Sequence, residues 1–308
     1  MSSNLKLKVL LTGSNGFVGS KILEELKKSC HEIVPIYRKD IDNRNIDQNT
    51  NWKDFLKNVD CIIHTAARAH IIKEISKDPI AEFRKVNVEG TINLANQAVK
   101  AGVKRFIFIS TIKVNGEFNK INSPMVEELE CYPSDAYSCS KYEAEIALQS
   151  IAKKTNLEIV IIRPPLVYGP KVKANFESLI NLVKKRIPLP FRYSYNRRSY
   201  ISLTNLVDFI ILCIQNPRAK NEIFLISDDH DLSIEDLVMK ISKHCETRVI
   251  LFPIPVKILS IILRNTKFND YLNKLYGNLT VDISKAKTLL SWKPKISVDE
   301  GIKKIFNN

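Results

Sequence analysis

A glycine-rich loop near the start of the chain restricts the possible folds more than any other feature. It follows a hydrophobic segment, residues 7–12, that predicts a buried strand, and it precedes an amphipathic segment, residues 17–28, that predicts a helix. Its glycines have the spacing G-x-x-G-x-x-G. Gly13 makes the tight turn, Gly16 lets the backbone approach a pyrophosphate, and Gly19 lets the helix pack closely on the sheet. Because a helix N-terminus attracts anions, the loop predicts a dinucleotide-binding site.

Strand-like and helix-like segments alternate along the first half of the chain. Further buried strands are predicted at residues 31–37, 60–65, 105–110 and 157–162, and helices at residues 52–57, 80–100 and 134–154. Such alternation implies a parallel sheet with helices on both faces. The fold class predicted is therefore α/β, a Rossmann-type doubly wound parallel sheet with a smaller C-terminal substrate-binding lobe.

The second lobe is predicted from a change in the pattern after Arg163. Prolines become frequent there, and the helical segments become shorter. We expect a dinucleotide-binding domain over residues 1–165 and a mainly substrate-binding lobe over residues 166–308, with segments that interleave. Ligands of such sheets bind outside the carboxyl ends of the strands, where the lobe is expected to pack.

The composition excludes several kinds of partner. The formal net charge is +14, but the lysines are scattered, and no zinc spacing, helix-turn-helix or aromatic-basic stripe favours nucleic acid. The histidines show no metal-ligand pattern, and His64 and His70 are expected to be core or loop residues. We therefore predict neither a nucleic-acid partner nor a metal.

The chain also lacks the signals of secretion or membrane insertion. No apolar run approaches the roughly 20 residues that cross a bilayer, and the longest one, residues 254–263, is interrupted by Pro255 and Lys257. The N-terminus has no signal-peptide pattern, and the six cysteines form no Cys-x-x-Cys pair, which favours reduced thiols. A cytoplasmic location is expected.

The chemistry is predicted from a tyrosine and a lysine at the start of a helix. Tyr137 and Lys141 are four residues apart and therefore share one helix face. A phenol has a pKa of about 10, and a nearby ammonium is expected to lower it. The pair then becomes an acid/base for a carbinol or carbonyl oxygen. Thr111, at the exit of the strand over 105–110, is expected to supply a hydroxyl that shares the proton.

The end of the second strand bears on the choice of cofactor. An acidic residue at that place accepts hydrogen bonds from the adenosine ribose and favours NAD, whereas a guanidinium can pair with a 2′-phosphate. The strand here ends in a sequence that contains Arg38 and Asp40. An NAD(P) cofactor is predicted, with NADP(H) slightly favoured. The alternatives are that Arg38 stacks on adenine or that Asp40 serves NAD.

Together these motifs resemble the extended short-chain dehydrogenase/reductase superfamily, the NAD-dependent epimerase/dehydratase family, over almost the whole chain. The resemblance is also carried by His64-Thr65-Ala66-Ala67, Asn87 with Gly90-Thr91, Arg163-Pro164 through Tyr168-Gly169-Pro170, and Trp292-x-Pro294. It implies a Rossmann domain with a small substrate lobe, a homodimer, and a nucleotide-activated sugar, here a UDP-sugar, as substrate.

By matching position, the resemblance also implies the roles of individual residues. Thr111, Tyr137 and Lys141 would form the catalytic triad. The cofactor would contact Gly13, Asn15, Gly16, Phe17, Val18, Gly19, Arg38, Ala66, Ala67, Asn87, Lys141 and Pro164. The substrate would contact Lys113, Asn175 and Arg198, with Arg198 on the nucleotide diphosphate. For Arg198 the alternative is a solvated surface residue beside Arg197, and for Lys113 a solvent-facing or packing role.

The loop after Thr111 separates the members of the family. In the 4,6-dehydratases the catalytic threonine is followed by Asp and Glu, whereas this chain has Ile112 and Lys113. The resemblance therefore disfavours elimination. Residues 110–117, 163–176 and 196–199 resemble a subgroup that includes reductases of UDP-4-keto-6-deoxy-N-acetylhexosamines for surface polysaccharides.

A UDP-4-keto-6-deoxy-sugar 4-reductase is thus the favoured function. The alternative is a UDP-glucose or UDP-N-acetylglucosamine 4-epimerase, although many epimerases carry Asn where this chain has Leu166 and Asp-Asp near Thr204-Asn205. A non-catalytic nucleotide-sensing protein is a minor alternative, disfavoured by the intact catalytic set.

Overall fold

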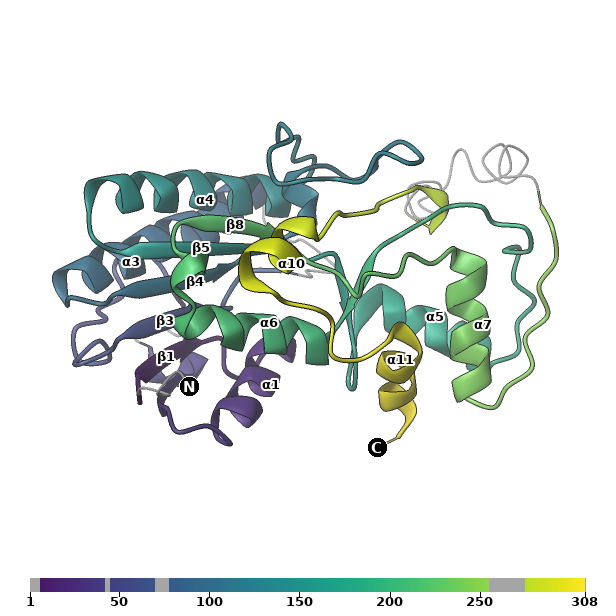
Figure 1. The fold of residues 1–308 in the computed structure, drawn as a ribbon, viewed down its shortest axis with the longest axis horizontal. Helices are drawn as coiled ribbons and strands as arrows, with labels where there is room; N and C mark the ends of the chain where they lie inside the picture. Colours follow the sequence, from purple (N-terminus) through teal and green to yellow (C-terminus); the bar gives the residue numbers. More distant parts are fainter. Residues whose placement is uncertain (1–5, 42–44, 70–77, 255–274, 308) are drawn as a thin grey trace.

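The computed structural model describes residues 6–41, 45–69, 78–254 and 275–307. A six-stranded sheet crosses it in the order β2-β1-β3-β4-β5-β8, and every neighbouring pair is parallel (Figure 1). The strands are β1 (Lys8–Thr12), β2 (Glu32–Ile36), β3 (Cys61–His64), β4 (Arg105–Ile109), β5 (Glu158–Arg163) and β8 (Glu222–Leu225). The predicted Rossmann-type α/β fold is confirmed.

Helices cover both faces of this sheet (Figure 1). Alternate residues of a strand point to opposite faces. Accordingly Val9 and Leu11 share one hydrophobic cluster with α1 (Phe17–Leu26) and α6 (Leu203–Gln215). Leu10 belongs to a second cluster, with α3 (Gly90–Lys100) and α4 (Ala136–Lys154). The continuous apolar runs in the sequence are therefore strands that are buried on both faces.

A third hydrophobic cluster forms the smaller lobe. It packs α5 (Ala174–Lys184), α7 (Ile234–His244) and α11 (Val298–Phe306) around the two-stranded sheet β6 (Leu166–Tyr168) and β7 (Tyr200–Ser202). The chain also returns to the large sheet after residue 166, because β8 pairs with β5 and α10 (Ser284–Leu290) packs on β8. The division into two functional lobes near residue 165 stays a prediction.

Two predicted helices differ from the structure. The segment predicted at 80–100 consists of α2 (Pro79–Arg84), a π-helical turn (Lys85–Glu89) and α3. The short helix predicted at 52–57 is wrong, because these residues form only hydrogen-bonded turns. Tertiary contacts hold them instead: the Trp52 side chain is buried, and its backbone N–H donates to Gln97 at 2.8 Å. A segment this short does not sustain a helix on propensity alone. The remaining short helical turns are Arg38–Asp40, Ile112–Val114 (η4) and Pro217–Ala219.

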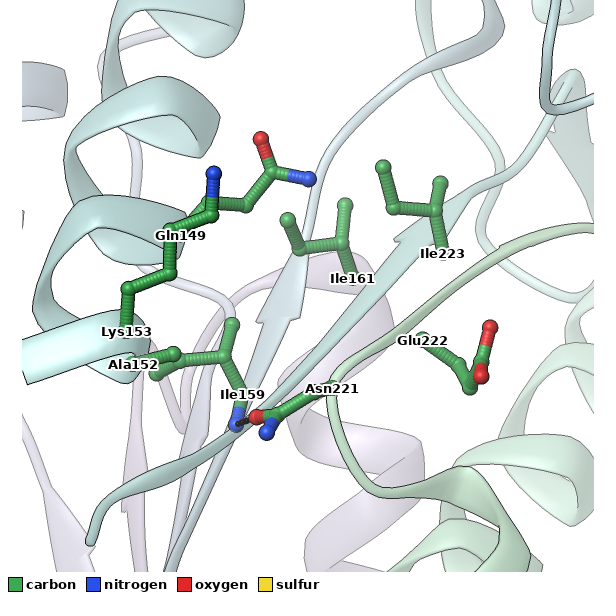
Figure 2. Close-up of a pocket in the computed structure, with 8 residues that line it drawn as sticks. All are labelled: Gln149, Ala152, Lys153, Ile159, Ile161, Asn221, Glu222 and Ile223. Atoms are coloured by element: carbon green, nitrogen blue, oxygen red, sulfur yellow. Dashed lines mark hydrogen bonds between the residues drawn. The ribbon is translucent and has the colours of Figure 1, made fainter. Parts of the chain in front are cut away.

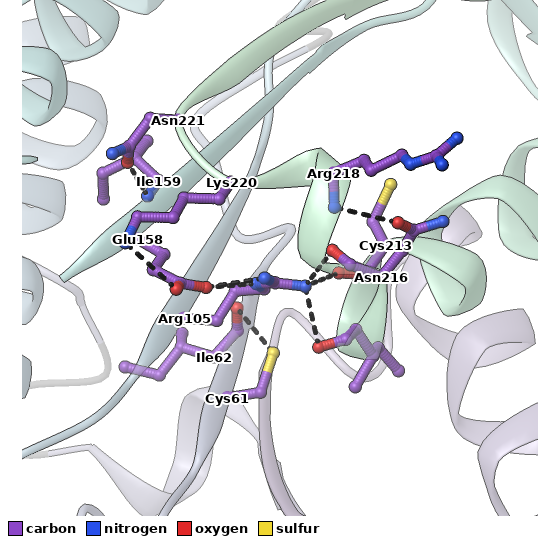
Figure 3. Close-up of polar contacts among 11 residues, drawn as sticks. Cys61, Ile62, Arg105, Glu158, Ile159, Cys213, Asn216, Arg218, Lys220 and Asn221 are labelled. Carbon is purple, nitrogen blue, oxygen red and sulfur yellow. Dashed lines mark hydrogen bonds and ion pairs between the residues drawn. The ribbon is translucent and has the colours of Figure 1, made fainter. Parts of the chain in front are cut away.

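A buried arginine links the centre of the sheet to the end of α6 (Figure 3). Arg105 on β4 forms an ion pair with Glu158 at 2.6 Å and donates through Nη1 to the carbonyl oxygens of Cys213, Ile214 and Asn216. A guanidinium is well suited to these carbonyls, which have no partner within the helix. The contact fixes the end of α6 against two central strands.

All six cysteines are free thiols, as predicted. Burial raises the pKa of Cys61 to about 12, so this thiol is unreactive at neutral pH. Within the described ranges no helix is long and apolar enough to cross a membrane. Most of the longest apolar run, residues 255–263, lies outside the described residues.

Candidate active site

The glycine loop lies at the carboxyl end of β1, between β2 and β3, where the order of the strands reverses. Gly13 has a positive φ of 72°, and a Cβ added there would lie 2.7 Å from Thr65 Oγ1. A Cβ at Gly19 would lie 2.2 Å from the carbonyl oxygen of Gly13. The first and third glycines are thus required by the turn and by the close packing of α1, as the spacing predicts.

The loop also fits the phosphates of a dinucleotide. The N-cap of α1 is Gly16, which offers no side chain to the free N–H groups, and the first turn carries no acidic residue. These N–H groups can therefore bind an anion. Asn15, Phe17 and Val18 lie in the same turn, where the sequence predicts them to contact the cofactor.

Gly19→Ala tests whether the glycine loop binds the dinucleotide. The added Cβ would collide with the backbone of Gly13, so the loop must open. We expect the affinity for the dinucleotide to fall by about tenfold or more, equivalent to at least 1.4 kcal/mol. Calorimetric titration of the purified protein measures the change. Ser20→Ala, at the next and exposed position, should bind like the wild type, and unchanged binding by Gly19→Ala would contradict the assignment.

A histidine on β3 forms hydrogen bonds with the end of β1, just before the glycine loop, and with α3. His64 is buried as predicted, with Nδ1 2.7 Å from Thr12 Oγ1 and Nε2 3.1 Å from Thr91 Oγ1. Burial, with the nearby charge of Lys141, lowers the pKa of His64 to about 3. His64 is therefore neutral and joins β1, β3 and α3. His70 lies outside the described residues.

Asn87 lies buried in the π-helical turn and connects two parts of the site. Its amide donates to Ser140 on α4 at 2.9 Å and exchanges two hydrogen bonds with the backbone of Arg68. It thereby fixes the segment after β3 that contains Ala66 and Ala67, both predicted to contact the cofactor. The structure gives the Asn87 side chain a clear positioning role, whereas its contact with the cofactor stays a prediction.

The three predicted catalytic residues come from two neighbouring elements. Thr111 caps the turn η4 after β4, and its Oγ1 accepts from the N–H of Lys113 at 3.3 Å. Tyr137 and Lys141 lie in the first two turns of α4, which packs against η4. Lys141 is only 1% exposed, and its Nζ lies 3.8 Å from the centroid of the Phe108 ring on β4. Sequence order and fold together thus bring the three to one region.

The ionisation of this pair differs from the expectation. Burial, followed by the charge of Asp135, raises the pKa of Tyr137 to about 12, whereas a lowered value was expected from Lys141. Burial also lowers the pKa of Lys141 to about 7, an effect that Glu145 partly opposes. The expectation failed because Lys141 is buried and Tyr137 is partly buried, and desolvation disfavours the charged form of each.

A buried ion pair that joins α4 to the end of β5 was missed by the sequence reasoning. Arg163 at the end of β5 and Glu145 on α4 are 3% and 1% exposed, with 2.5 Å between Nη2 and Oε2. Arg163 also donates to Asn115, just after η4, at 3.0 Å. Next to it, the Pro164 carbonyl accepts from Ile112 at 2.9 Å. One usable signal was the spacing of four from Tyr137 through Lys141 to Glu145, which places all three side chains on one face of α4.

The three predicted substrate residues have different surroundings. Lys113 forms an ion pair with Asp135 at 2.7 Å, and Asn175 is exposed in the first turn of α5. Arg198 is half-buried and donates to the Gly277 carbonyl at 3.0 Å, and burial lowers its pKa. This contact disfavours the alternative of a solvated Arg198, while its contact with the substrate stays a prediction. Its neighbour Arg197 is the exposed one.

The turn after β2 contains the two residues that bear on the choice between NAD and NADP(H). Arg38 is exposed and begins the turn Arg38–Asp40. The carboxylate of Asp40 accepts from the backbone N–H of Tyr37 at 2.8 Å, so it caps this turn. One oxygen of Asp40 is thus used within the turn, and both Arg38 and Asp40 are exposed.

A cavity of about 200 Å³ lies elsewhere, between α4 and the strands β5 and β8 (Figure 2). Figure 2 shows Ile161 and Ile223 on its floor, with Gln149 and Lys153 at one side. Its lining is Gln149, Ala152, Lys153, Ile159, Ile161, Asn221, Glu222 and Ile223. None of these is a predicted site residue, so the chemistry is assigned to the strand ends and not to this cavity.

Known proteins resemble this chain in sequence and in fold. A model described as the NAD dependent epimerase/dehydratase family matches residues 9–227. UDP-glucose 4-epimerase of Vibrio cholerae is 42% identical over 305 residues, 96% of this chain and 93% of that protein.

Two solved structures share the fold. UDP-glucuronic acid 4-epimerase from Bacillus cereus in complex with NAD has a TM-score of 0.76 at 22% identity, with 98% of both chains covered. RMD from Pseudomonas aeruginosa complexed with NADPH has a TM-score of 0.77 at 16% identity, with the same coverage. From the match to the family model and the similarity to the Vibrio protein, the chain belongs to the NAD-dependent epimerase/dehydratase family, within the extended short-chain dehydrogenases/reductases.

Proposed function

We propose that this protein interconverts a ketone and an alcohol at C4 of a UDP-hexosamine, and that it works as a 4-reductase of a UDP-4-keto-6-deoxy-N-acetylhexosamine. The observation that carries the proposal is that Thr111 caps the turn η4, which packs against α4, the helix that carries Tyr137 and Lys141. The glycine loop, Ala66, Ala67 and Pro164 would hold the cofactor at the neighbouring strand ends. When bound, its nicotinamide ring exchanges a hydride with the sugar carbon.

The protein's own residues would manage the proton. Tyr137 donates a proton to the C4 oxygen in the reductive direction and accepts it in the oxidative direction. The high pKa of Tyr137 keeps the phenol protonated, which suits a donor. The Thr111 hydroxyl would share this hydrogen bond. Burial lowers the pKa of Lys141 to about 7. Hydroxyl groups of the cofactor ribose would accept hydrogen bonds from its ammonium and so favour the charged form.

The loop after Thr111 supports C4 redox chemistry over elimination. Ile112 is buried, and the Lys113 ammonium is held by Asp135. Neither of these residues can act as the carboxylic acid or carboxylate that removal of water from C5 and C6 requires. A 4,6-dehydratase is therefore not proposed.

Arg38 supports NADP(H) as the cofactor. Its guanidinium is exposed at the end of β2, and the nearby carboxylate of Asp40 caps the turn. A guanidinium pairs well with a phosphate. We expect Arg38→Ser to weaken NADPH by about tenfold, or 1.4 kcal/mol, with little change for NADH. Parallel titrations measure both affinities, and Lys39→Ser controls for general loss of charge. An equal loss for both nucleotides would contradict the preference.

A 4-epimerase is the second candidate, and the 42% identity with the Vibrio UDP-glucose 4-epimerase favours it. The two functions differ in what happens to the nucleotide. A reductase consumes one NADPH for each sugar and releases the oxidised form. Tightly retained NAD in the purified protein, with UDP-GlcNAc and UDP-GalNAc interconverted and no net consumption of nucleotide, would overturn the reductase.

The setting of the enzyme follows from the same proposal. We expect it to act in the cytoplasm, on a UDP-sugar destined for surface polysaccharide, and to form a homodimer. Arg198 and Asn175 are proposed to contact the nucleotide diphosphate. Sedimentation of the purified chain measures the oligomeric state.

A further inference from the structure

An ion pair joins the threonine turn to the start of the catalytic helix. Lys113 Nζ lies 2.7 Å from Asp135 Oδ2, and the two side chains are 38% and 36% exposed. Lys113 belongs to η4, which begins just after Thr111. Asp135 is the N-cap of α4 and lies two residues before Tyr137. The pair therefore spans the two elements that carry the proposed catalytic groups.

Asp135 has two separate effects on α4. Its Oδ1 accepts from the N–H of Ser138 at 2.7 Å and caps the helix, while Oδ2 binds Lys113. Its negative charge also disfavours the phenolate of Tyr137, and is the second cause, after burial, of the raised pKa of that phenol. The cap needs only an oxygen acceptor, whereas the effect on Tyr137 needs the charge. The two effects can therefore be separated by an amide.

We propose that Lys113 is a positioning residue for proton transfer: its ion pair with Asp135 holds the Thr111 turn against α4 and screens the Asp135 carboxylate from the Tyr137 phenol. This inference rests on the proposed role of Tyr137. It gives a function to the lysine at the position where dehydratases of the family carry an acid. It also explains why the site tolerates a carboxylate so near a group that must ionise.

The other described groups near Tyr137 come from α4, α2, β3 and the segment after β3, where the Arg68 guanidinium lies over the Phe83 ring at 5.6 Å. On its own helix, Lys141 lies one turn further along and is buried. From α2, the uncharged ring of Phe83 packs against Tyr137 with 6.2 Å between centroids. Also on α2, Arg84 is neutralised by Glu143 on α4 at 2.6 Å. His64 on β3 is neutral, because its pKa is about 3.

The test measures the pH dependence of sugar oxidation in four variants: Lys113→Met, Asp135→Asn, the double variant, and Lys8→Met. Asn is as good an N-cap as Asp, so Asp135→Asn removes the charge and keeps the cap. Lys8→Met removes a cation from the Lys8–Glu32 ion pair, far from the site in the sheet order, and should match the wild type.

With Lys113→Met, the acid limb of kcat/KM should move to higher pH by about half to one unit, or about three- to tenfold in rate on that limb. Asp135→Asn should move it to lower pH. The double variant should match Asp135→Asn, because Lys113 acts on Tyr137 through Asp135. A Lys113→Met variant that raises KM without moving the limb would overturn the proposal and indicate direct sugar contact instead.

A second readout keeps this inference distinct from the proposed function. Tyrosine labelled on its phenol carbon reports ionisation by NMR, and the Tyr137 signal is identified by its loss in Tyr137→Phe. Asp135→Asn should bring the Tyr137 ionisation to lower pH even if no sugar is turned over. No change in this signal would overturn the inference, whereas absence of turnover with a shifted signal would count only against the proposed function.

Discussion

Tyr137→Phe is expected to reduce turnover of the 4-keto nucleotide sugar by about 100- to 10,000-fold, the range in which a positioned general acid contributes. The ring would remain packed against Phe83, where the two centroids are 6.2 Å apart, so the fold and the binding of the cofactor should persist. The change removes only the hydroxyl that is proposed to carry the proton. Steady-state rates with saturating nucleotide measure the loss.

A matched control is available a few residues away. Tyr132→Phe removes another phenol hydroxyl, from a side chain that is 64% exposed and bonded to Glu130 outside the proposed site. This variant should keep wild-type turnover. Full activity of Tyr137→Phe toward every C4 nucleotide sugar that the wild type accepts would refute the catalytic assignment and leave a different acid to be found.

The second large effect is expected on stability, from the buried Arg163–Glu145 pair. Arg163→Met should lower the free energy of unfolding by about 3–5 kcal/mol, because it leaves the Glu145 carboxylate buried without its partner. It also removes the contact to Asn115, so the turn after Thr111 should loosen. Denaturant unfolding followed by circular dichroism measures the loss.

The double variant Arg163→Met/Glu145→Leu separates this mechanism from simple loss of packing. Replacing a buried ion pair by apolar groups is often neutral or stabilising. We therefore expect the double variant to recover most of the lost stability, although activity should stay low because Asn115 loses its donor. If the double variant were less stable than Arg163→Met, the loss would come from packing and not from an unpaired charge.

Much of the fold could be predicted because it depends on local patterns. The apolar segments around β1, β3, β4 and β5 are buried on both faces of the sheet. The glycine loop lies at the junction of β1 and α1, where the backbone of Gly13 has a positive φ. The region of Tyr137 and Lys141 was also predictable, since a spacing of four fixes their shared helix face.

What could not be predicted depends on contacts between distant residues. Arg163 and Glu145 are 18 residues apart, and Lys113 and Asp135 are 22 apart. The spacing of four places Glu145 on the helix face of Tyr137 and Lys141, but nothing in the sequence points from Glu145 to Arg163 or from Lys113 to Asp135. The raised pKa of Tyr137 depends on its partial burial and on the charge of Asp135, which the Tyr137–Lys141 spacing does not contain. The turn at 52–57 is held by Gln97 from α3, a contact that overrides local propensity.

Transfer of deuterium is the most direct test of the proposed C4 reduction. The purified protein would receive a UDP-4-keto-6-deoxy-N-acetylhexosamine and NADPH deuterated at the transferred position of the nicotinamide, and the product would be analysed by NMR and mass spectrometry. We predict one deuterium at C4 for each NADPH consumed. A product without deuterium at C4, or interconversion of 4-hydroxy UDP-sugars with no NADPH consumed, would contradict it.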